Sequence, residues 1–196
     1  KHLKETSILL NYHLEEPLNE EKWTLKKTKE IVFHEIVNSL ETVGNIGNKT
    51  KLFNEFIERE KKDSCCIGEQ IALPHLRTLQ CKDLLIAIIT STEGIDFGAF
   101  DQQPVKIFFA FIAPPYEDHL YRVLYKNLTS LFENPDSVNT FLQIEKPGEI
   151  IRYLKQEFFF FFLFYKISDG NIFNLDFLKV GILLKSMAMN GKAICG

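Results

Sequence analysis

The chain has 196 residues, 45% of them hydrophobic, which is enough to form one domain with a sizeable core and a small appendage. Its formal net charge of −3 argues against a protein that binds nucleic acid or anionic membranes, because both functions require a clustered basic face. The four cysteines lack the spacing of a disulfide framework, and the N-terminal residues do not resemble a signal peptide. We therefore expect free thiols and a cytoplasmic protein.

The first part of the chain predicts one strand and two helices. Residues 6–14 (TSILLNYHL) are typical of an early strand, and a polar connection follows through Pro17. Apolar residues recur at helical spacing over residues 28–40, and the sequence GNIGN then interrupts the pattern. A second helix is expected around residues 52–60, with Leu, Phe and Ile on one side.

Two continuous apolar runs predict central strands. These are LLIAIIT at residues 84–90 and VKIFFAFIA at residues 105–113, and such runs are typical of strands that are covered on both faces. Two adjacent prolines, Pro114 and Pro115, end the second run. The sequence between the runs is rich in turn-forming residues and predicts a loop.

The following region predicts helices. Residues 119–132 show helical spacing that ends at Asn134-Pro135-Asp136, and shorter helices are expected around residues 138–142 and 150–154. Buried strands therefore alternate with amphipathic helices. We expect an α/β fold, a single three-layer sandwich with a mixed central sheet and helices on both faces.

His75, which ends the apolar run IALPH, is open to three interpretations. It can be a structural histidine at a strand end, with the nearby cysteines packed as small hydrophobic side chains. It can bind a metal with Cys65, Cys66 and Cys81, although paired zinc ligands are usually about two to four residues apart and two of these cysteines are adjacent. It can also be a nucleophile, because an imidazole with an ordinary pKa of about 6.5 is largely neutral at cellular pH. Pro74 would stiffen the backbone before it.

A family resemblance changes the weight of these interpretations. The pattern RExxxSxxIGxxIALPH at residues 59–75 resembles the signature of enzyme IIA domains of the phosphoenolpyruvate-dependent sugar phosphotransferase system, in the fructose/mannitol/nitrogen-regulatory class. Two later segments, EGIDFGAFDQQPVKIFFAFIAPP and EDHLYRVLYKNLTSLFENPDSVNTFLQIEKPGEIIRYL, resemble the same family in the same order. The chain departs from the pattern at Cys65 and Cys66, where the family commonly has Thr-Gly, and at Gln70, where a glycine is common.

The resemblance implies roles for three residues. His75 would be the phosphorylated residue, His119 would lie beside it at the start of a helix, and Arg59 would help to hold the phosphate. These roles are physically reasonable, because phosphohistidine carries nearly two negative charges that fixed donors must balance. A guanidinium can bind two phosphate oxygens at once, and a helix start adds a partial positive charge.

The resemblance also implies a function and its partners. The chain would be a phosphotransferase component that accepts phosphate from the small carrier HPr on His75 and passes it to an enzyme IIB domain for sugar uptake. Alternatively, it would be a nitrogen-type regulator whose phosphorylation controls binding to a target protein. Neither function requires a metal, a cofactor, nucleic acid or direct membrane insertion. A metal or redox module built from the cysteines is a third hypothesis.

The resemblance covers residues 6–157, which we expect to form the phosphocarrier domain. Residues 158–196 lie outside it and form a tail of unknown role. The aromatic run EFFFFFLFYK at its start is too short to cross a bilayer, which requires about 20 residues.

Overall fold

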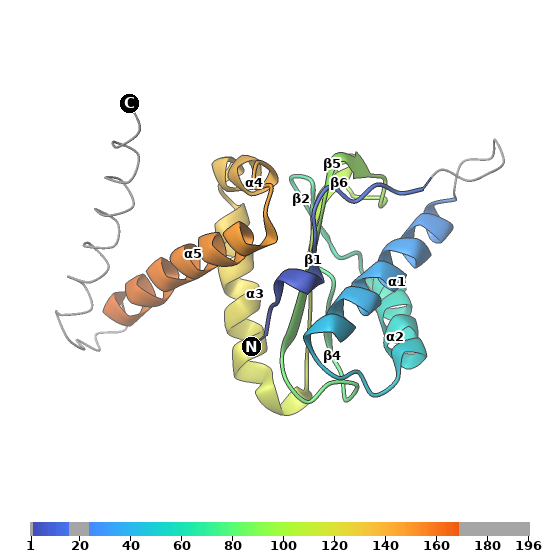
Figure 1. The fold of residues 1–196 in the computed structure, drawn as a ribbon, viewed down its shortest axis with the longest axis horizontal. Helices are drawn as coiled ribbons and strands as arrows, with labels where there is room; N and C mark the ends of the chain where they lie inside the picture. The colour runs from blue at the N-terminus through green and yellow to red at the C-terminus, as the bar shows by residue number, and fades with distance from the viewer. Residues whose placement is uncertain (1, 16–23, 169–196) are drawn as a thin grey trace. The chain divides into compact units, whose positions relative to one another are not determined.

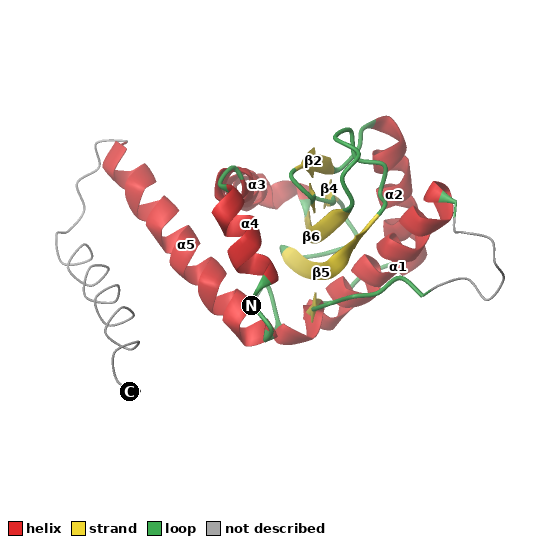
Figure 2. Ribbon diagram, turned by 90° about the horizontal axis from the view of Figure 1, so that it is seen from above, coloured by secondary structure: helices red, strands yellow, loops and turns green. Residues whose placement is uncertain are grey.

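We describe residues 2–15 and 24–168 of the chain from a computed structural model. The chain divides into two compact units, Lys1–Tyr153 and Leu154–Gly196. The first unit contains a six-stranded mixed sheet with helices on both faces (Figures 1 and 2), counted over the described residues. The predicted α/β fold with a central mixed sheet is therefore confirmed. The predicted boundary at residue 157 stays a prediction.

The helices and strands follow the chain in the order that Figure 1 colours. Short 3₁₀ turns at Glu5–Ser7 and Pro115–Glu117 precede a strand and a helix respectively. The helices are α1 Leu25–Val43, α2 Lys49–Lys62, α3 Asp118–Phe132, α4 Pro135–Leu142 and α5 Pro147–Ser168. The strands are β1 Ile8–Leu9, β2 Cys66–Gly68, β3 Ile71–Ala72, β4 His75–Arg77, β5 Leu85–Ile95 and β6 Val105–Ala113.

Side-chain caps fix where three of the helices begin. The hydroxyl of Thr24 accepts a hydrogen bond from the backbone of Lys27 at the start of α1, and the Asn48 side chain accepts one from Lys51 at 2.8 Å at the start of α2. Asn134 caps α4, whose first residue is a proline with no N–H to satisfy. These caps satisfy backbone donors that have no partner inside the helix.

Four of the five predicted helices agree with the structure to within a few residues, whereas α5 continues to Ser168, well beyond the expected residues 150–154. The strands also differ in length. The first strand is only Ile8–Leu9, because Asn11 has a φ of 55° and a left-handed residue cannot continue an extended strand. Strand β5 continues to Ile95, through residues that were expected to form a loop. Its register shifts between Thr90 and Ile95, and Gly94 there has a φ of 79°. This bulge lets the strand pass through turn-forming residues.

Strand β6 is the centre of the sheet. It pairs antiparallel with β5 along one edge and parallel with β3 and then β4 along the other. Between β3 and β4 the chain passes through Pro74, which has no donor, but its carbonyl still accepts a hydrogen bond from Phe111 at 3.0 Å. The chain therefore stays against β6 up to His75.

The two faces of the sheet are covered by different helices. Helices α1 and α2 cover one face and form a continuous buried cluster with it, whereas α3 and α4 lie against the other (Figures 1 and 2). Alternate residues of β6 point to opposite faces, so that Phe108, Ala110 and Ile112 join the α1/α2 cluster. None of the described helices, α5 included, is both long and apolar enough to cross a bilayer.

Candidate functional site

His75 is the first residue of β4 and lies on the face of the sheet that α3 covers. In the register of the sheet it lies opposite Phe111 of β6, and the two rings stack with their centroids 5.5 Å apart. The next residue, Leu76, points to the opposite face and packs against the α1/α2 cluster. The alternation of a short strand therefore turns His75 toward α3 and leaves it partly exposed.

A backbone carbonyl determines which nitrogen of His75 carries the proton. Nδ1 lies 2.6 Å from the carbonyl oxygen of Leu73. Since a carbonyl can only accept, Nδ1 must donate, and Nε2 then holds the lone pair of a neutral ring. The nucleophilic atom of this imidazole is Nε2.

The surroundings of His75 favour the neutral ring. Burial lowers the pKa of the imidazole below its ordinary value, and the positive charges of Arg59 and Arg77 lower it further. The hydrogen bond to Leu73 and the charge of Asp63 act in the opposite direction but do not prevail. The lone pair of Nε2 is therefore available at neutral pH.

Aromatic side chains of α3 form the wall beside His75. The ring of Tyr125 lies 4.9 Å from the imidazole and that of Tyr121 lies 5.8 Å from it, both measured between centroids. Tyr121 also contacts Phe111 at 5.3 Å. The two tyrosines are one helical turn apart, so that they present their rings to the same side.

Two arginines place positive charge near the imidazole. Arg59, near the end of α2, binds the carbonyl oxygen of Asp63 at 3.0 Å and its carboxylate at 3.2 Å. Arg77, on the same strand as His75, binds the carboxylate of Asp118 at 2.8 Å and lies over the ring of Tyr121 at 4.6 Å. The sequence pattern pointed to Arg59 but not to Arg77. The signal for Arg77 is its spacing of two from His75, which has meaning only once residues 75–77 are known to form a strand.

A buried carboxylate organises the loop between α2 and β2. The Glu60 side chain is 5% exposed and accepts hydrogen bonds from Lys29 at 2.7 Å, from the backbone of Cys65 at 2.8 Å and from Ser64 at 3.2 Å. The carbonyl of Cys65 in turn accepts from the backbone of Leu73 at 2.8 Å. Because the carbonyl of Leu73 binds His75, hydrogen bonds connect Glu60 to the imidazole through the backbone.

The three cysteines considered as possible metal ligands, Cys65, Cys66 and Cys81, are free thiols. Burial raises the pKa of Cys65 well above its ordinary value. Among the described residues, no group of three His, Cys, Asp or Glu side chains is arranged to hold a metal ion.

His119 lies in the first turn of α3, where it is exposed. The structure shows no hydrogen bond or ring contact between it and His75, and the α3 residues that contact the imidazole are Tyr121 and Tyr125. Residues two apart on a helix point about 200° away from each other, so His119 and Tyr121 occupy different faces of α3. The predicted role of His119 stays a prediction.

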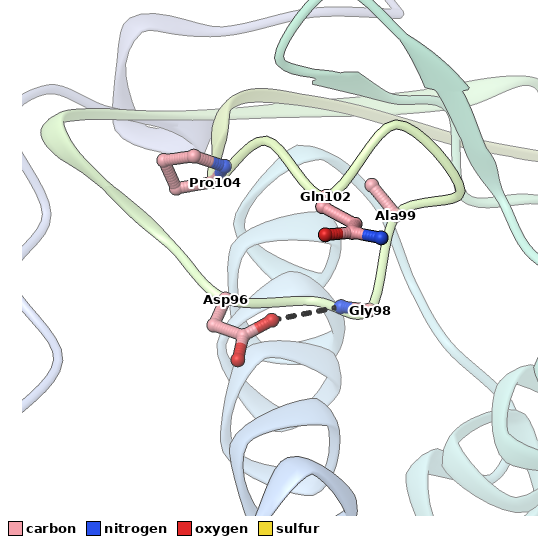
Figure 3. A pocket seen from close by; sticks show the side chains of 5 residues that line it. All are labelled: Asp96, Gly98, Ala99, Gln102 and Pro104. Atoms are coloured by element: carbon pink, nitrogen blue, oxygen red, sulfur yellow. Dashed lines mark hydrogen bonds between the residues drawn. The ribbon is translucent and has the colours of Figure 1, made fainter.

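A hollow of about 300 Å³ lies elsewhere, in the loop between β5 and β6 (Figure 3). Its one carboxylate, that of Asp96, already accepts a hydrogen bond from the backbone of Gly98 at 3.1 Å. None of the residues predicted to form the site lines this hollow. It is lined by Asp96, Gly98, Ala99, Gln102 and Pro104.

Comparison with known protein families identifies the family to which the chain belongs. Residues 16–157 match the model of the phosphoenolpyruvate-dependent sugar phosphotransferase system, EIIA 2. The chain belongs to this EIIA family. Its sequence is 28% identical over 130 residues to the PTS system fructose-specific EIIABC component of Bacillus subtilis, and the aligned region is 66% of this chain and 20% of that protein. It is 30% identical over 95 residues to the PTS system fructose-specific EIIA component of Haloferax volcanii, and the aligned region is 47% of this chain and 62% of that protein.

Solved structures of EIIA proteins share the fold. Nitrogen Regulatory Protein IIA-Ntr from Neisseria meningitidis matches with a TM-score of 0.60 and 24% identity, over 76% of this chain and 93% of that one. Enzyme IIA mannitol in complex with phosphorylated enzyme IIB mannitol from Escherichia coli matches with a TM-score of 0.59 and 16% identity, over 78% of this chain and 96% of that one. At these identities the match establishes the fold of this EIIA chain.

Proposed function

We propose that this EIIA chain is a phosphohistidine carrier of the sugar phosphotransferase system and that Nε2 of His75 takes the phosphoryl group. The observation that carries the proposal is the 2.6 Å hydrogen bond from Nδ1 to the Leu73 carbonyl, which leaves the lone pair on Nε2. Membership of the EIIA family supports phosphoryl transfer as the chemistry. The proposed location is the cytoplasm, and the proposed carrier domain spans residues 6–157, with residues 158–196 as a separate tail.

The first transfer is a displacement at phosphorus. The lone pair of Nε2 attacks the phosphorus of the phosphohistidine on an HPr-like donor, and the new N–P bond forms as the donor's N–P bond breaks. The donor's imidazole leaves with the bonding electron pair. The ring of His75, now substituted at Nε2 and still protonated at Nδ1, carries a positive charge, which the Leu73 carbonyl stabilises.

The same hydrogen bond assists the second transfer. In that step the thiolate of a cysteine on an enzyme IIB domain attacks the phosphorus, and the electron pair of the N–P bond returns to Nε2. A protonated ring is a good leaving group, because it becomes a neutral imidazole when the bond breaks. The Escherichia coli complex of enzyme IIA with phosphorylated enzyme IIB supports a partner of this kind.

Arg59 and His119 are the proposed phosphate-binding residues. Arg59 lies close enough to His75 for its charge to lower the pKa of the imidazole, and its partner Asp63 has a side chain that is 74% exposed. An exposed ion pair contributes little, so the guanidinium can exchange this carboxylate for phosphate oxygens at small cost. His119 would approach a phosphoryl group from the start of α3, where the helix adds a partial positive charge.

The experiment that tests the proposal is phosphorylation by purified partners. The chain is incubated with phosphoenolpyruvate, enzyme I and HPr, and acid-labile phosphate is measured by intact mass for wild type and for His75→Ala. We expect wild type to gain one phosphate and the variant to gain none. If His75→Ala gains acid-labile phosphate as well as wild type does, the proposed function is wrong.

A regulatory function is the second candidate. The match to the nitrogen regulatory protein of Pseudomonas aeruginosa, 27% identical over 85 residues, favours it. In that case the phosphorylated and unphosphorylated forms would differ in binding to a target protein. Onward transfer of the phosphate to an enzyme IIB domain would support the transport function, whereas recovery of non-transport partners alone would support regulation.

A further inference from the structure

A phosphoryl group on Nε2 of His75 would be stabilised further by a cation besides Arg59. It carries nearly two negative charges at neutral pH. Arg59 is paired with Asp63, so this pair is neutral as a whole. A second cation beside the imidazole would therefore add to the stabilisation of the phosphoryl group.

Arg77 is placed to be that cation. It is two residues after His75 on β4, so both side chains project from the same face of the strand, with their Cα atoms roughly 6 to 7 Å apart. The ring of Tyr121 is close to both groups, 5.8 Å from the imidazole and 4.6 Å from the guanidinium carbon. We propose that Arg77 is a phosphate-binding residue for phosphorylated His75 and that Tyr121 positions its guanidinium. This inference rests on the proposed function of His75.

The charge of Arg77 is not cancelled by its acidic partner. Asp118 binds Arg77 at 2.8 Å with one carboxylate oxygen and Arg122 at 2.5 Å with the other. The group of two arginines and one aspartate therefore carries one net positive charge. The charge of Arg77 reaches both His75 and Tyr121, because it lowers the pKa of each side chain.

Two contacts already hold the guanidinium of Arg77 before any phosphate arrives. It lies over the ring of Tyr121, and one of its terminal nitrogens binds Asp118. A pre-oriented guanidinium loses less side-chain entropy on binding and can offer its remaining N–H groups to phosphate oxygens. The side chain is 46% exposed, so an incoming phosphoryl group can reach it.

The chain offers a matched control for this proposal. Arg122 has the same charge and the same carboxylate partner, but it lies on α3 and is 72% exposed. Wild type, Arg77→Gln, Arg77→Lys and Arg122→Gln are phosphorylated with phosphoramidate, a small donor that needs no protein partner. The rate of incorporation on His75 is measured by intact mass, and circular dichroism verifies the fold of each variant.

We expect Arg77→Gln to slow incorporation by about tenfold or more, since a charge-assisted hydrogen bond to phosphate is among the strong ones. Arg77→Lys should recover part of the rate, because it restores the charge without the planar fork. Arg122→Gln should slow incorporation less than Arg77→Gln does, because it leaves Asp118 to Arg77 alone but removes no group that binds the phosphoryl group. Tyr121→Phe, which keeps the ring, should resemble wild type, whereas Tyr121→Leu should resemble Arg77→Gln.

A second measurement separates binding of phosphate from a structural effect. The phosphoryl group of phosphorylated His75 is titrated by ³¹P NMR in wild type and in Arg77→Gln. A neighbouring cation favours the doubly charged phosphoryl group, so its removal should raise the phosphoryl pKa. The charges of Arg59, Asp63 and Asp118 are common to both proteins and cancel in the comparison.

The outcomes separate the two proposals. If wild type takes no phosphate on His75, the proposed function fails, and this inference fails with it. If wild type is phosphorylated but Arg77→Gln matches Arg122→Gln in rate and matches wild type in phosphoryl pKa, only the role of Arg77 is overturned.

Discussion

Replacement of Glu60 by glutamine should destabilise the chain, because this carboxylate connects two helices and the loop that leads to β2. It receives three hydrogen bonds, from Lys29, Ser64 and the backbone of Cys65, and is 5% exposed. Glutamine has the same shape but no charge, and its amide group would turn two donors toward other donors. Removing one member of a buried ion pair costs about 3–5 kcal/mol, and a lost hydrogen bond to a charged group about 1.5–3 kcal/mol.

The expected loss lies toward the lower of these ranges. The Lys29 side chain is 21% exposed, so it can recover part of its hydration when its partner is gone. We therefore expect Glu60→Gln to lower the free energy of unfolding by about 2–3 kcal/mol, measured by urea unfolding followed by circular dichroism. Amide hydrogen exchange at Cys65 should also accelerate, since its N–H loses a charged acceptor.

Glu58→Gln is the matched control for this prediction. Glu58 is two residues away on α2 and pairs with Lys61 at 2.6 Å, but both side chains are more than 60% exposed. Its replacement should leave the unfolding free energy unchanged within error, because exposed pairs are screened by solvent. If Glu60→Gln and Glu58→Gln had the same effect, the inferred role of the buried carboxylate would be wrong.

Three further predictions concern His75, Cys81 and the core. By NMR titration, the pKa of His75 should lie below about 6.5, Arg59→Gln should raise it and Asp63→Asn should lower it further. Because the folded pKa is depressed, the unfolded state binds this proton at a higher pH than the folded state does. The free energy of unfolding therefore falls as the pH is lowered from about 6.5 to the folded pKa. His75→Ala should lack that part of the loss, and a titration midpoint of His75 above about 6.5 would contradict the reasoning. Burial and three nearby carboxylates raise the pKa of Cys81 to about 12. This thiol should therefore resist iodoacetamide at about pH 8 until the chain is unfolded, as peptide mass spectrometry would show. Rapid labelling of Cys81 in the native protein would refute this. Phe56 is 2% exposed and stacks on Phe33, so Phe56→Ala should lower the unfolding free energy by about 3–5 kcal/mol in urea unfolding, whereas Leu79→Ala, at a position that is 77% exposed, should have little effect.

The long elements of this fold could be predicted from local sequence, and the short ones could not. Strand β6 matches its apolar run residue for residue, because a continuous apolar segment of that length is buried wherever it lies in a sheet. Strands β2, β3 and β4 have two or three residues each, too few for any periodicity to show. They form because β3 and β4 pair with one edge of β6 and β2 pairs with β3, which is a property of the assembled sheet.

The departure at Gln70 shows what the family pattern could and could not reveal. A glycine is common there in the family that the sequence resembles, and Gln70 has a φ of 66°, in the left-handed region that glycine tolerates best. The backbone conformation thus persists although the residue that favours it is absent. Two hydrogen bonds to the carbonyl of Gln70, from Lys106 at 2.7 Å and Ile107 at 3.1 Å, hold the turn against β6.

The environment of His75 depends on contacts that no local pattern encodes. The sequence indicated the histidine through its resemblance to a family, but not its tautomer, which depends on a carbonyl two residues earlier. That carbonyl is directed at Nδ1 because Pro74 separates β3 from β4 and both strands bind the same edge of β6. Arg77 is brought to the site by the same strand alternation, and Tyr121 and Tyr125 by the phase of α3. The chemistry of Nε2 is thus determined by how a three-residue strand pairs, and the residue types alone do not contain that information.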